Sequence, residues 1–237
     1  MDKRPGTIQD MFDRIAPTYD LLNHLLSLCI DTVWRRKTLN RLGIEGEDSI
    51  LDIATGTGDL AMLALRKNRG CRVVGLDLSG GMLRIAAKKI AGKGYGGRYF
   101  PVEGDACRMP LKGCAFDHVM VAFGIRNVSD VEGLFRETRK ILKKGGKFAI
   151  LEFSIPEIRF VRKIYFLYLK KLIPLIGELL SGKTGSYHYL GDSVVDFHSP
   201  KELANILRMS GFSVIESLTL WFGICHLFVV KSDRSFT

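Results

Sequence analysis

The stretch Asp52-Ile53-Ala54-Thr55-Gly56-Thr57-Gly58-Asp59 decides the fold of this chain. An apolar run over 49–53 breaks into a turn with two glycines, and a helical pattern follows. Because glycine has no Cβ, a ligand can lie against bare backbone at Gly56 and Gly58, and the first turn of the next helix offers unpaired N–H groups. The stretch therefore predicts a strand, a cofactor-binding turn and a helix.

The pattern Gly56-x-Gly58-x-x-Ala61 also fits a dinucleotide-binding turn. Two carboxylates separate the interpretations, because Asp52 closes the strand and Asp59 stands where NAD or FAD would place its pyrophosphate. An acid at that point repels phosphates, whereas S-adenosylmethionine carries a sulfonium and an ammonium and no phosphate. We therefore expect S-adenosylmethionine as the bound molecule, with Asp52, Gly56 and Gly58 in its site.

The composition limits the class of protein. With 237 residues, 46% of them hydrophobic, the chain can bury one sizeable core. The net charge of +10 indicates an anionic neighbour, which can be a nucleic acid, a membrane surface or an acidic substrate. The five cysteines form no C-x-x-C pair, so neither a disulfide framework nor a zinc site is expected, and no metal is predicted. The sequence contains no apolar leader and no long uncharged apolar run, so we expect a cytoplasmic protein that does not span a membrane.

From Ser49 onward, strand and helix patterns alternate, as a parallel sheet covered on both faces requires. The Gly145-Gly146 turn is expected to start the fifth strand. The expected strands are 49–53, 71–77, 98–103, 117–123 and 147–153, and the expected helices between them are 58–68, 80–91 and 130–142.

The last part of the chain predicts a different connection. Ser199 and Pro200 open a helix as its cap and its first residue, and Gly211 ends it. Strands over 213–220 and 225–231 are joined by a short turn at Gly223, so we expect an antiparallel hairpin at one sheet edge. A purely parallel dinucleotide-binding fold need not end in this way.

Two helical segments lie outside this alternation. Residues 7–42 have apolar side chains at helical spacing with a break at Ala16-Pro17, and they can either cover the mouth of a site or pack on the sheet. In the insert 155–198, a helix over 159–171 places four cations within a wedge of about 100° and apolar side chains on the other side. This basic helix can lie on an anionic membrane or cover a greasy substrate, and the alternative is a lid helix with solvated charges.

Ligands of such sheets bind outside the carboxyl ends of the strands. Asp77 ends the second strand, where a carboxylate can accept both hydroxyls of a ribose; the alternative is a helix cap. Asp105 follows the third strand and can bind an adenine amino group, with Ala106 giving a backbone N–H; the alternative is a surface turn. After the fourth strand, Arg126 and Asn127 would face the reaction centre as a fixed cation and an amide.

Several motifs in chain order resemble the ubiquinone/menaquinone biosynthesis C-methyltransferase family. The resemblance covers most of the chain. The glycine turn marks the superfamily, whereas the segment 123–128 and the tyrosine-rich segment 187–190 are specific to the family. The motifs that carry it are 12–20, 52–59, 75–79 with Met82-Leu83, 104–106 with Met109-Pro110, 123–128, 151–154 with Pro156, Ile173-Pro174 and 187–190.

The resemblance implies a class I methyltransferase fold (Rossmann-like) with a mostly parallel seven-stranded α/β sheet and an antiparallel C-terminal hairpin. It places the methyl donor at Thr57, Asp77, Asp105 and Ala106. Ala122 departs from the family, which often has serine at that position, so we leave it out of the site. The expected single domain consists of a helical cap (1–45), a cofactor-binding core (46–154), a helical lid or substrate insert (155–198) and a C-terminal helix with the hairpin (199–237).

The implied reaction moves a methyl group from sulfonium sulfur to a ring carbon of a polyprenylated demethylquinol. Loss of a phenolic proton would push charge onto that carbon. Arg126 is permanently charged, so we expect it to be the counter-charge of the phenolate. Asn127 would orient the ring or a water, and Tyr19 with the cluster Tyr187-His188-Tyr189 would relay the proton.

Two other functions remain open at this stage. One is transfer from the same donor to another lipid or phenolic acceptor, and the other is methylation of RNA, which the net charge favours but for which no base pocket or binding module is found. A non-catalytic role is disfavoured by the complete glycine turn. We expect demethylmenaquinol rather than the ubiquinone precursor as acceptor, no nucleic acid, a peripheral contact with the inner face of the membrane through 159–171, and a homodimer compatible with the resemblance.

Overall fold

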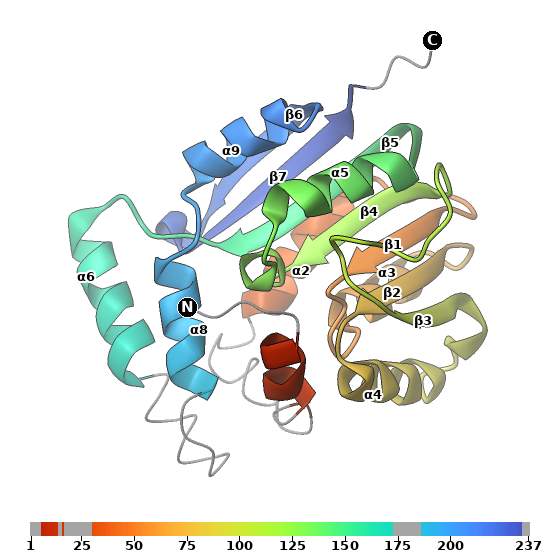
Figure 1. The fold of residues 1–237 in the computed structure, drawn as a ribbon, viewed down its shortest axis with the longest axis horizontal. Coiled ribbons are helices and arrows are strands. Elements are labelled where there is room, and N and C mark those ends of the chain that lie inside the picture. The colour runs from red at the N-terminus through yellow and green to blue at the C-terminus, as the bar shows by residue number, and fades with distance from the viewer. Residues whose placement is uncertain (1–5, 14–15, 17–29, 173–185, 234–237) are drawn as a thin grey trace.

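The computed structural model describes residues 6–13, 16, 30–172 and 186–233. Its centre is a seven-stranded sheet with the strand order β3-β2-β1-β4-β5-β7-β6 (Figure 1). The first five strands are parallel to one another, and β7 runs antiparallel to both β5 and β6. The strands are β1 (Ser49–Ile53), β2 (Arg72–Asp77), β3 (Tyr99–Glu103), β4 (Phe116–Ala122), β5 (Leu142–Phe153), β6 (Phe212–Leu220) and β7 (Cys225–Ser232).

Helices cover both faces of the sheet. The α-helices are α2 (Ile30–Leu42), α3 (Asp59–Lys67), α4 (Gly80–Ala91), α5 (Val131–Ile141), α6 (Arg159–Leu167), α8 (Ser186–Val195) and α9 (Pro200–Met209). Short turns of other helix types lie at Gly96–Arg98, Ile125–Asn127, Tyr168–Leu172 and Trp221–Gly223. Residues 6–13 are also helical.

The two faces have separate apolar cores because side chains alternate along each strand. Ile50 of β1 packs with residues of α2, α3 and α4, whereas Leu51 and Ile53 pack with residues of α5 and α9. Figure 1 shows α5 and α9 in front of the sheet and α2 and α3 behind it. The expected α/β fold is confirmed, including the antiparallel hairpin at the edge.

Local sequence signals predicted most ends of the helices and strands to within one or two residues of the observed ends. The Ser199 hydroxyl accepts from the Glu202 N–H and the Glu202 carboxylate accepts from the Ser199 N–H, so the expected cap of α9 is a complete capping box. Gly211 follows α9 with φ = 80°, a conformation that suits glycine. The predicted break at Pro17 lies outside the described residues.

The predicted start of the fifth strand was wrong. We expected Gly145-Gly146 to form a turn before Lys147, but β5 begins at Leu142, directly after α5. Leu142 pairs with Phe116 and Lys147 pairs with His118, so the additional residues of β5 bulge out of the ladder, with Gly145 at φ = 77°. Leu142 before the bulge and Phe148 after it are both buried in the same core cluster, which holds the strand on both sides.

Candidate functional site

A pocket opens at the carboxyl ends of β1, β2, β3 and β4, where the strand order reverses between β1 and β4. This is the position at which open α/β sheets bind their ligands. Four strand ends and the helical residues 6–13 contribute to it. Its lining is formed by Ile8, Gln9, Phe12, Ala54, Gly56, Leu76, Asp77, Leu78, Ser79, Met82, Gly104, Asp105, Ala106, Ala122, Phe123, Gly124, Asn127, Val128 and Ser129.

The two glycines of the turn have different roles. Gly56 has φ = 56° and lines the pocket, and a Cβ built on it would meet no atom within 4 Å. This backbone is therefore open to a bound molecule, as expected. A Cβ on Gly58 would lie 3.0 Å from Ile90 Cδ1 and 3.1 Å from Ala86 Cβ, so Gly58 allows α3 and α4 to approach each other.

Asp77 is held at the pocket by the glycine turn itself. The Gly56 N–H donates to Asp77 Oδ2 at 2.8 Å, and the Ser79 N–H donates to Asp77 Oδ1 at 2.9 Å. Burial raises the pKa of this carboxyl, although both hydrogen bonds act in the opposite direction. The side chain of Asp77 is thus fixed on the pocket wall, and its binding of ribose hydroxyl groups stays a prediction.

Asp52 and Thr57 are buried at the glycine turn. Asp52 is 1% exposed, and its Oδ2 accepts from the Thr55 hydroxyl at 2.7 Å. Burial raises the pKa of Asp52 to about 7. Thr57 is also buried. Neither residue is part of the pocket lining formed by the described residues.

The loop after β3 brings Asp105 and Ala106 into the pocket lining, as predicted. Asp105 Oδ1 accepts from the Cys107 N–H at 2.8 Å, and this bond fixes the side chain in its turn. Gly104 makes the turn compact, because a Cβ there would lie 2.9 Å from Pro110 Cδ. The loop can therefore present a carboxylate and a backbone N–H to a planar ring.

The loop after β4 meets the glycine turn directly. A Cβ on Gly124 would lie 2.6 Å from Ala54 Cβ, so only glycine permits this approach. Phe123 stacks on Phe153 with ring centroids 4.4 Å apart. Asn127 lines the pocket, and its Oδ1 accepts from the Tyr189 hydroxyl at 3.1 Å. Asn127 therefore lies in the same pocket as Asp77, with its amide orientation set by Tyr189.

Arg126 does not extend into that pocket. Its side chain is 4% exposed, its Nη1 donates to Glu152 Oε1 at 2.9 Å and to the Phe123 carbonyl, and its Nε donates to Ser193 Oγ at 3.2 Å. Glu152 also accepts from the Arg126 backbone N–H at 3.2 Å. The positive charge of Arg126 is therefore paired with the buried carboxylate of Glu152. The expected role of Arg126 as counter-charge of a phenolate would require this charge to face the substrate.

Sequence reasoning missed Glu152 and Ser193 as partners of Arg126. The available signal was an acid inside the apolar strand 147–153, which burial makes costly unless a cation lies near it. Tyr19 lies outside the described residues, and so does the side chain of His188.

The helical segment 6–13 is a second part of the site that was predicted only in outline. Ile8 and Phe12 line the pocket. Asp13 accepts from the Ser79 hydroxyl and, at 3.0 Å, from the Gly81 N–H at the start of α4. This segment is therefore attached beside Asp77, whereas α2 of the same stretch packs on the sheet. That the N-terminal helices cover the mouth of a site stays a prediction.

The donor set suits an organic cofactor. Within the described ranges, no group of three or more His, Cys, Asp or Glu side chains is arranged to hold a metal ion. Gly56, Asp77 and Asp105 line the same pocket, and two carboxylates there favour a molecule with hydroxyl groups and an amino group over one with phosphates.

Comparisons with known proteins identify relatives along the whole chain. Residues 1–231 match the model of the ubiE/COQ5 methyltransferase family. A demethylmenaquinone methyltransferase of Bacteroides fragilis is 37% identical over 226 residues, which are 95% of this chain and 92% of that protein. The ubiquinone/menaquinone biosynthesis C-methyltransferase UbiE of Geotalea daltonii is 38% identical and covers 93% of this chain and 94% of its own length.

The fold is also found among solved structures. A SAM dependent methyltransferase from Aquifex aeolicus has a TM-score of 0.62 at 17% identity, over 83% of this chain and 88% of that one. At this identity the similarity shows the fold alone, which is that of the class I methyltransferases.

Proposed function

This chain belongs to the ubiE/COQ5 methyltransferase family, and from that premise we propose that its acceptor is a polyprenyl demethylquinol, with demethylmenaquinol preferred. The enzyme is an S-adenosylmethionine-dependent methyltransferase. The observation that carries the proposal is the position of Asn127, whose amide is oriented by Tyr189 in the pocket that also contains Asp77. One polar group that can bind a ring oxygen thus lies in the same pocket as the groups that we assign to the donor.

The donor half of the pocket consists of the ends of β1, β2 and β3. Asp77 would accept from the two ribose hydroxyls, and Asp105 would accept from the adenine amino group beside the Ala106 N–H. Gly56 would let the amino-acid part of the donor lie against the turn, where no Cβ intervenes. The Asp52 carboxylate binds the Thr55 hydroxyl of the turn, Gly58 allows α4 to pack against it, and Thr57 is buried there.

The reaction requires alignment and a better carbon nucleophile. The donor supplies an activated methyl group: the new bond joins this methyl to the ring carbon, and the bond to sulfur breaks, leaving S-adenosylhomocysteine. The acceptor loses one proton in total, which the solvent finally receives. The chain's own contribution is to hold the ring in line with the methyl group, exclude water and favour the phenolate.

Asn127 is the residue that we place against the acceptor. Because Tyr189 donates to its Oδ1, the amide N–H₂ group is left to donate elsewhere, and a phenolate oxygen is a strong acceptor. Arg126 would act indirectly, because it does not line the pocket. Its pairing with Glu152 fixes the loop 124–128 that carries Asn127. A direct contact of Arg126 with the phenolate, and a proton relay through Tyr19, remain predictions.

We also propose a peripheral contact of α6 and the residues that follow it, 159–171, with an anionic membrane surface. Arg159, Lys163 and Lys170 are exposed on this segment, and Arg162 donates to the carbonyl groups of Pro156 and Glu157 at 2.8 and 2.9 Å. No helix among the described residues is long and apolar enough to cross a bilayer. A quinol with a prenyl tail would reach such an enzyme from the membrane surface, and a homodimer is compatible with this arrangement.

The test is a single-turnover assay with isotopically labelled S-adenosylmethionine and chemically reduced demethylmenaquinol. The wild-type protein is expected to place the label in the quinol fraction. Asp77→Ala is expected to lose donor binding, whereas Asn127→Ala keeps donor binding and loses transfer. No transfer to demethylmenaquinol or to the ubiquinone precursor, despite clear donor binding, would remove the quinol from the proposal and leave another lipid or phenolic acceptor.

A further inference from the structure

The tip of the hairpin between β6 and β7 exposes two aromatic side chains. Trp221 is 50% exposed and Phe222 is 70% exposed. Both residues have positive φ angles, 46° and 55°, in the left-handed region that bulky residues rarely adopt. Two adjacent strained residues persist only where the surrounding structure holds them, and such positions are frequently functional.

The hairpin tip is held rigidly beside the start of α6. The Ser154 hydroxyl donates to the Gly223 carbonyl at 2.8 Å, and the Ser154 N–H donates to the Ile224 carbonyl at 2.9 Å. A Cβ on Gly223 would lie 3.1 Å from Pro156 Cα, so the tip and the residues before α6 are in close contact. The tip is therefore fixed with respect to this helix.

α6 exposes an apolar stripe next to its cations. Phe160, Ile164 and Leu167, which are spaced by four and three residues and so share one face, are 73%, 53% and 57% exposed. Tyr165 and Leu169 lie on another face and are buried against the molecule. Figure 1 shows α6 at the edge of the molecule, away from the sheet. The apolar stripe therefore faces outward.

The same segment carries a row of positive charges. Arg159, Lys163, Lys170 and Lys171 are all exposed, and the first three follow the flank of the apolar stripe on the helical wheel. An exposed helix with an apolar face, flanking cations and adjacent aromatic residues is the pattern that seats a protein at the headgroup boundary of an anionic bilayer. The net charge of +10 favours the same surface.

An aromatic cluster connects the hairpin tip with the pocket. The ring of Trp221 lies 6.3 Å from that of Trp34, and the ring of Trp34 lies 6.1 Å from that of Phe123 and 6.4 Å from that of Phe153. Phe123 lines the pocket. The exposed tip and the pocket wall are thus two ends of one packed cluster, so a surface that binds the tip is close to the site.

We propose that the aromatic tip, Trp221 and Phe222, inserts into the headgroup boundary of an anionic lipid bilayer and, together with the apolar stripe of α6, docks the enzyme there. The tip is a second membrane anchor, distinct from the basic residues of 159–171. The inference rests on the proposed function in one respect: an acceptor with a prenyl tail is held in the bilayer, so an enzyme that docks on the bilayer can reach it.

The first experiment measures how the full-length protein partitions onto vesicles of phosphatidylcholine with about one quarter phosphatidylglycerol. The test variant is Trp221→Gly with Phe222→Gly, because glycine accepts positive φ and relieves the strain. Thermal unfolding should show that this variant is folded, because relief of the backbone strain offsets part of the packing that Trp221 loses against Trp34. Its partition coefficient is expected to fall at least about tenfold, because the variant lacks the two aromatic side chains that the bilayer would bury.

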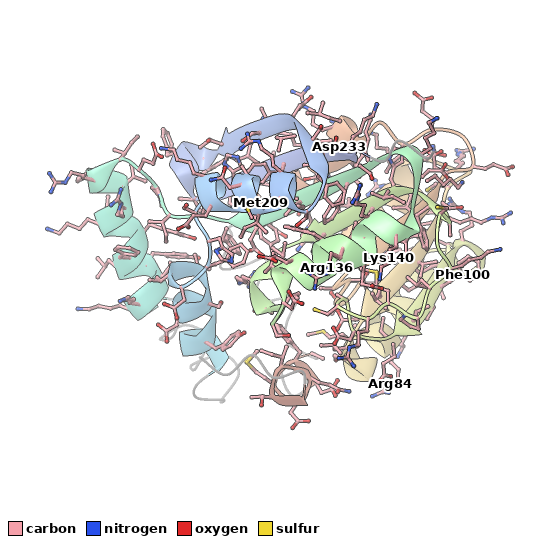
Figure 2. All side chains as sticks on the ribbon, turned by 45° about the horizontal axis from the view of Figure 1, so that its top comes forward. Arg84, Phe100, Arg136, Lys140, Met209 and Asp233 are labelled. Carbon is pink, nitrogen blue, oxygen red and sulfur yellow. The ribbon has the colours of Figure 1, made fainter. Side chains whose placement is uncertain are left out.

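A matched control is Phe100→Ser. Phe100 is 46% exposed on β3, at the opposite side of the molecule from α6, as Figure 2 shows. Its replacement should leave partitioning unchanged. Fluorescence gives a second readout: the chain has two tryptophans and Trp34 is 5% exposed, so acrylamide quenches chiefly Trp221. Anionic vesicles are expected to protect Trp221 from acrylamide.

Equal partitioning of the glycine variant and the wild type would overturn the proposal, and so would undiminished quenching of Trp221 on vesicles. Concentration-dependent dimers that the glycine variant loses, without any vesicle binding, would instead assign the tip to a second copy of the chain. Methyl transfer to a short-tailed, water-soluble quinol should be the same in the glycine variant and the wild type. A wild-type protein that docks through the tip but methylates no quinol would refute the proposed acceptor and leave the docking in place.

Discussion

The part of the site that we assign to the donor (the donor half) and the part that we assign to the acceptor (the acceptor half) are built in different ways. In the donor half, the backbone N–H groups of Gly56 and Ser79 hold Asp77, and these residues follow the neighbouring strands β1 and β2. In the acceptor half, side chains hold side chains: Arg126 binds Glu152 and Ser193, which come from segments far along the chain. The first half depends on a local turn and the second depends on the tertiary fold.

The largest effect is expected from breaking the acceptor half. Arg126→Ala leaves Glu152 buried without its cation, so the free energy of unfolding should fall by about 3–5 kcal/mol. Denaturant unfolding measures this loss. Arg136→Ala is the control, because Arg136 makes exposed ion pairs with Asp130 and Glu132 on α5 (Figure 2) and should change stability by less than about 1 kcal/mol. Equal losses in both variants would show that the buried pair does not support the acceptor half.

In the donor half, the buried carboxyl of Asp52 should make the free energy of unfolding depend on pH. Burial raises the pKa of Asp52 to about 7, whereas an unfolded aspartate titrates near about 3.9. The folded state therefore holds a proton that the unfolded state has released, and stability falls by up to about 4 kcal/mol as the pH rises from about 4 to 7.

Asp52→Asn should remove the contribution of Asp52 to that slope, because an amide does not titrate. The variant should still fold, since the amide oxygen can accept from the Thr55 hydroxyl. Free energies of unfolding at several pH values between 4 and 8 measure it for the variant and the wild type. Parallel curves would contradict the raised pKa. Glu47→Gln, at an exposed residue before β1, serves as the control variant.

Donor affinity should depend on Asp77. Asp77→Asn weakens two charged hydrogen bonds to the ribose, and about 2–3 kcal/mol corresponds to a roughly 30- to 150-fold increase in the Kd for S-adenosylmethionine. Titration calorimetry measures the Kd. Asp59→Asn alters an acid of the same turn that binds Lys89 at 2.7 Å, and it should keep the affinity. If both variants bind the donor equally well, Asp77 is not the ribose acceptor.

The smallest effect is expected from Tyr189→Phe, which sharpens the division between the halves. Asn127 loses one neutral hydrogen bond worth about 1 kcal/mol, so single-turnover methyl transfer should slow by about three- to tenfold. The Kd for the donor should stay the same. Tyr95→Phe, at a tyrosine that packs on Arg98, provides the matched control. A change in donor affinity with an unchanged transfer rate would reverse the assignment.

The sequence predicted which residues of the donor half meet at the pocket, because the determinants of their positions are local. Two glycines between acids, an apolar strand before them and a helix after them place Gly56, Asp77 and Asp105 at one sheet edge, and all three line the pocket. The separate jobs of the two glycines were not predictable, since the contact of Gly58 with Ala86 and Ile90 depends on how α4 packs.

The side-chain contacts of the acceptor half could not be predicted from the sequence. Arg126 was expected to meet the substrate, but its partner Glu152 comes from the neighbouring strand, and no local pattern pairs the two residues. The bulge in β5 was missed for the same reason, because it depends on the pairing of Leu142 with Phe116. A helical wheel separated the cations and the apolar side chains of α6, but it could not tell that Phe160 would be exposed and Tyr165 buried.

The most direct test of the division is a paired measurement on Asn127→Ala: the Kd for S-adenosylmethionine and the single-turnover rate of methyl transfer to demethylmenaquinol. Asn127 lies in the pocket beside the donor half but belongs to the acceptor half. The account predicts a Kd within about threefold of the wild type and a transfer rate lower by about 100-fold or more, the usual cost of removing one donor to a developing oxyanion. A variant that loses donor binding, or that transfers at the wild-type rate, would contradict it.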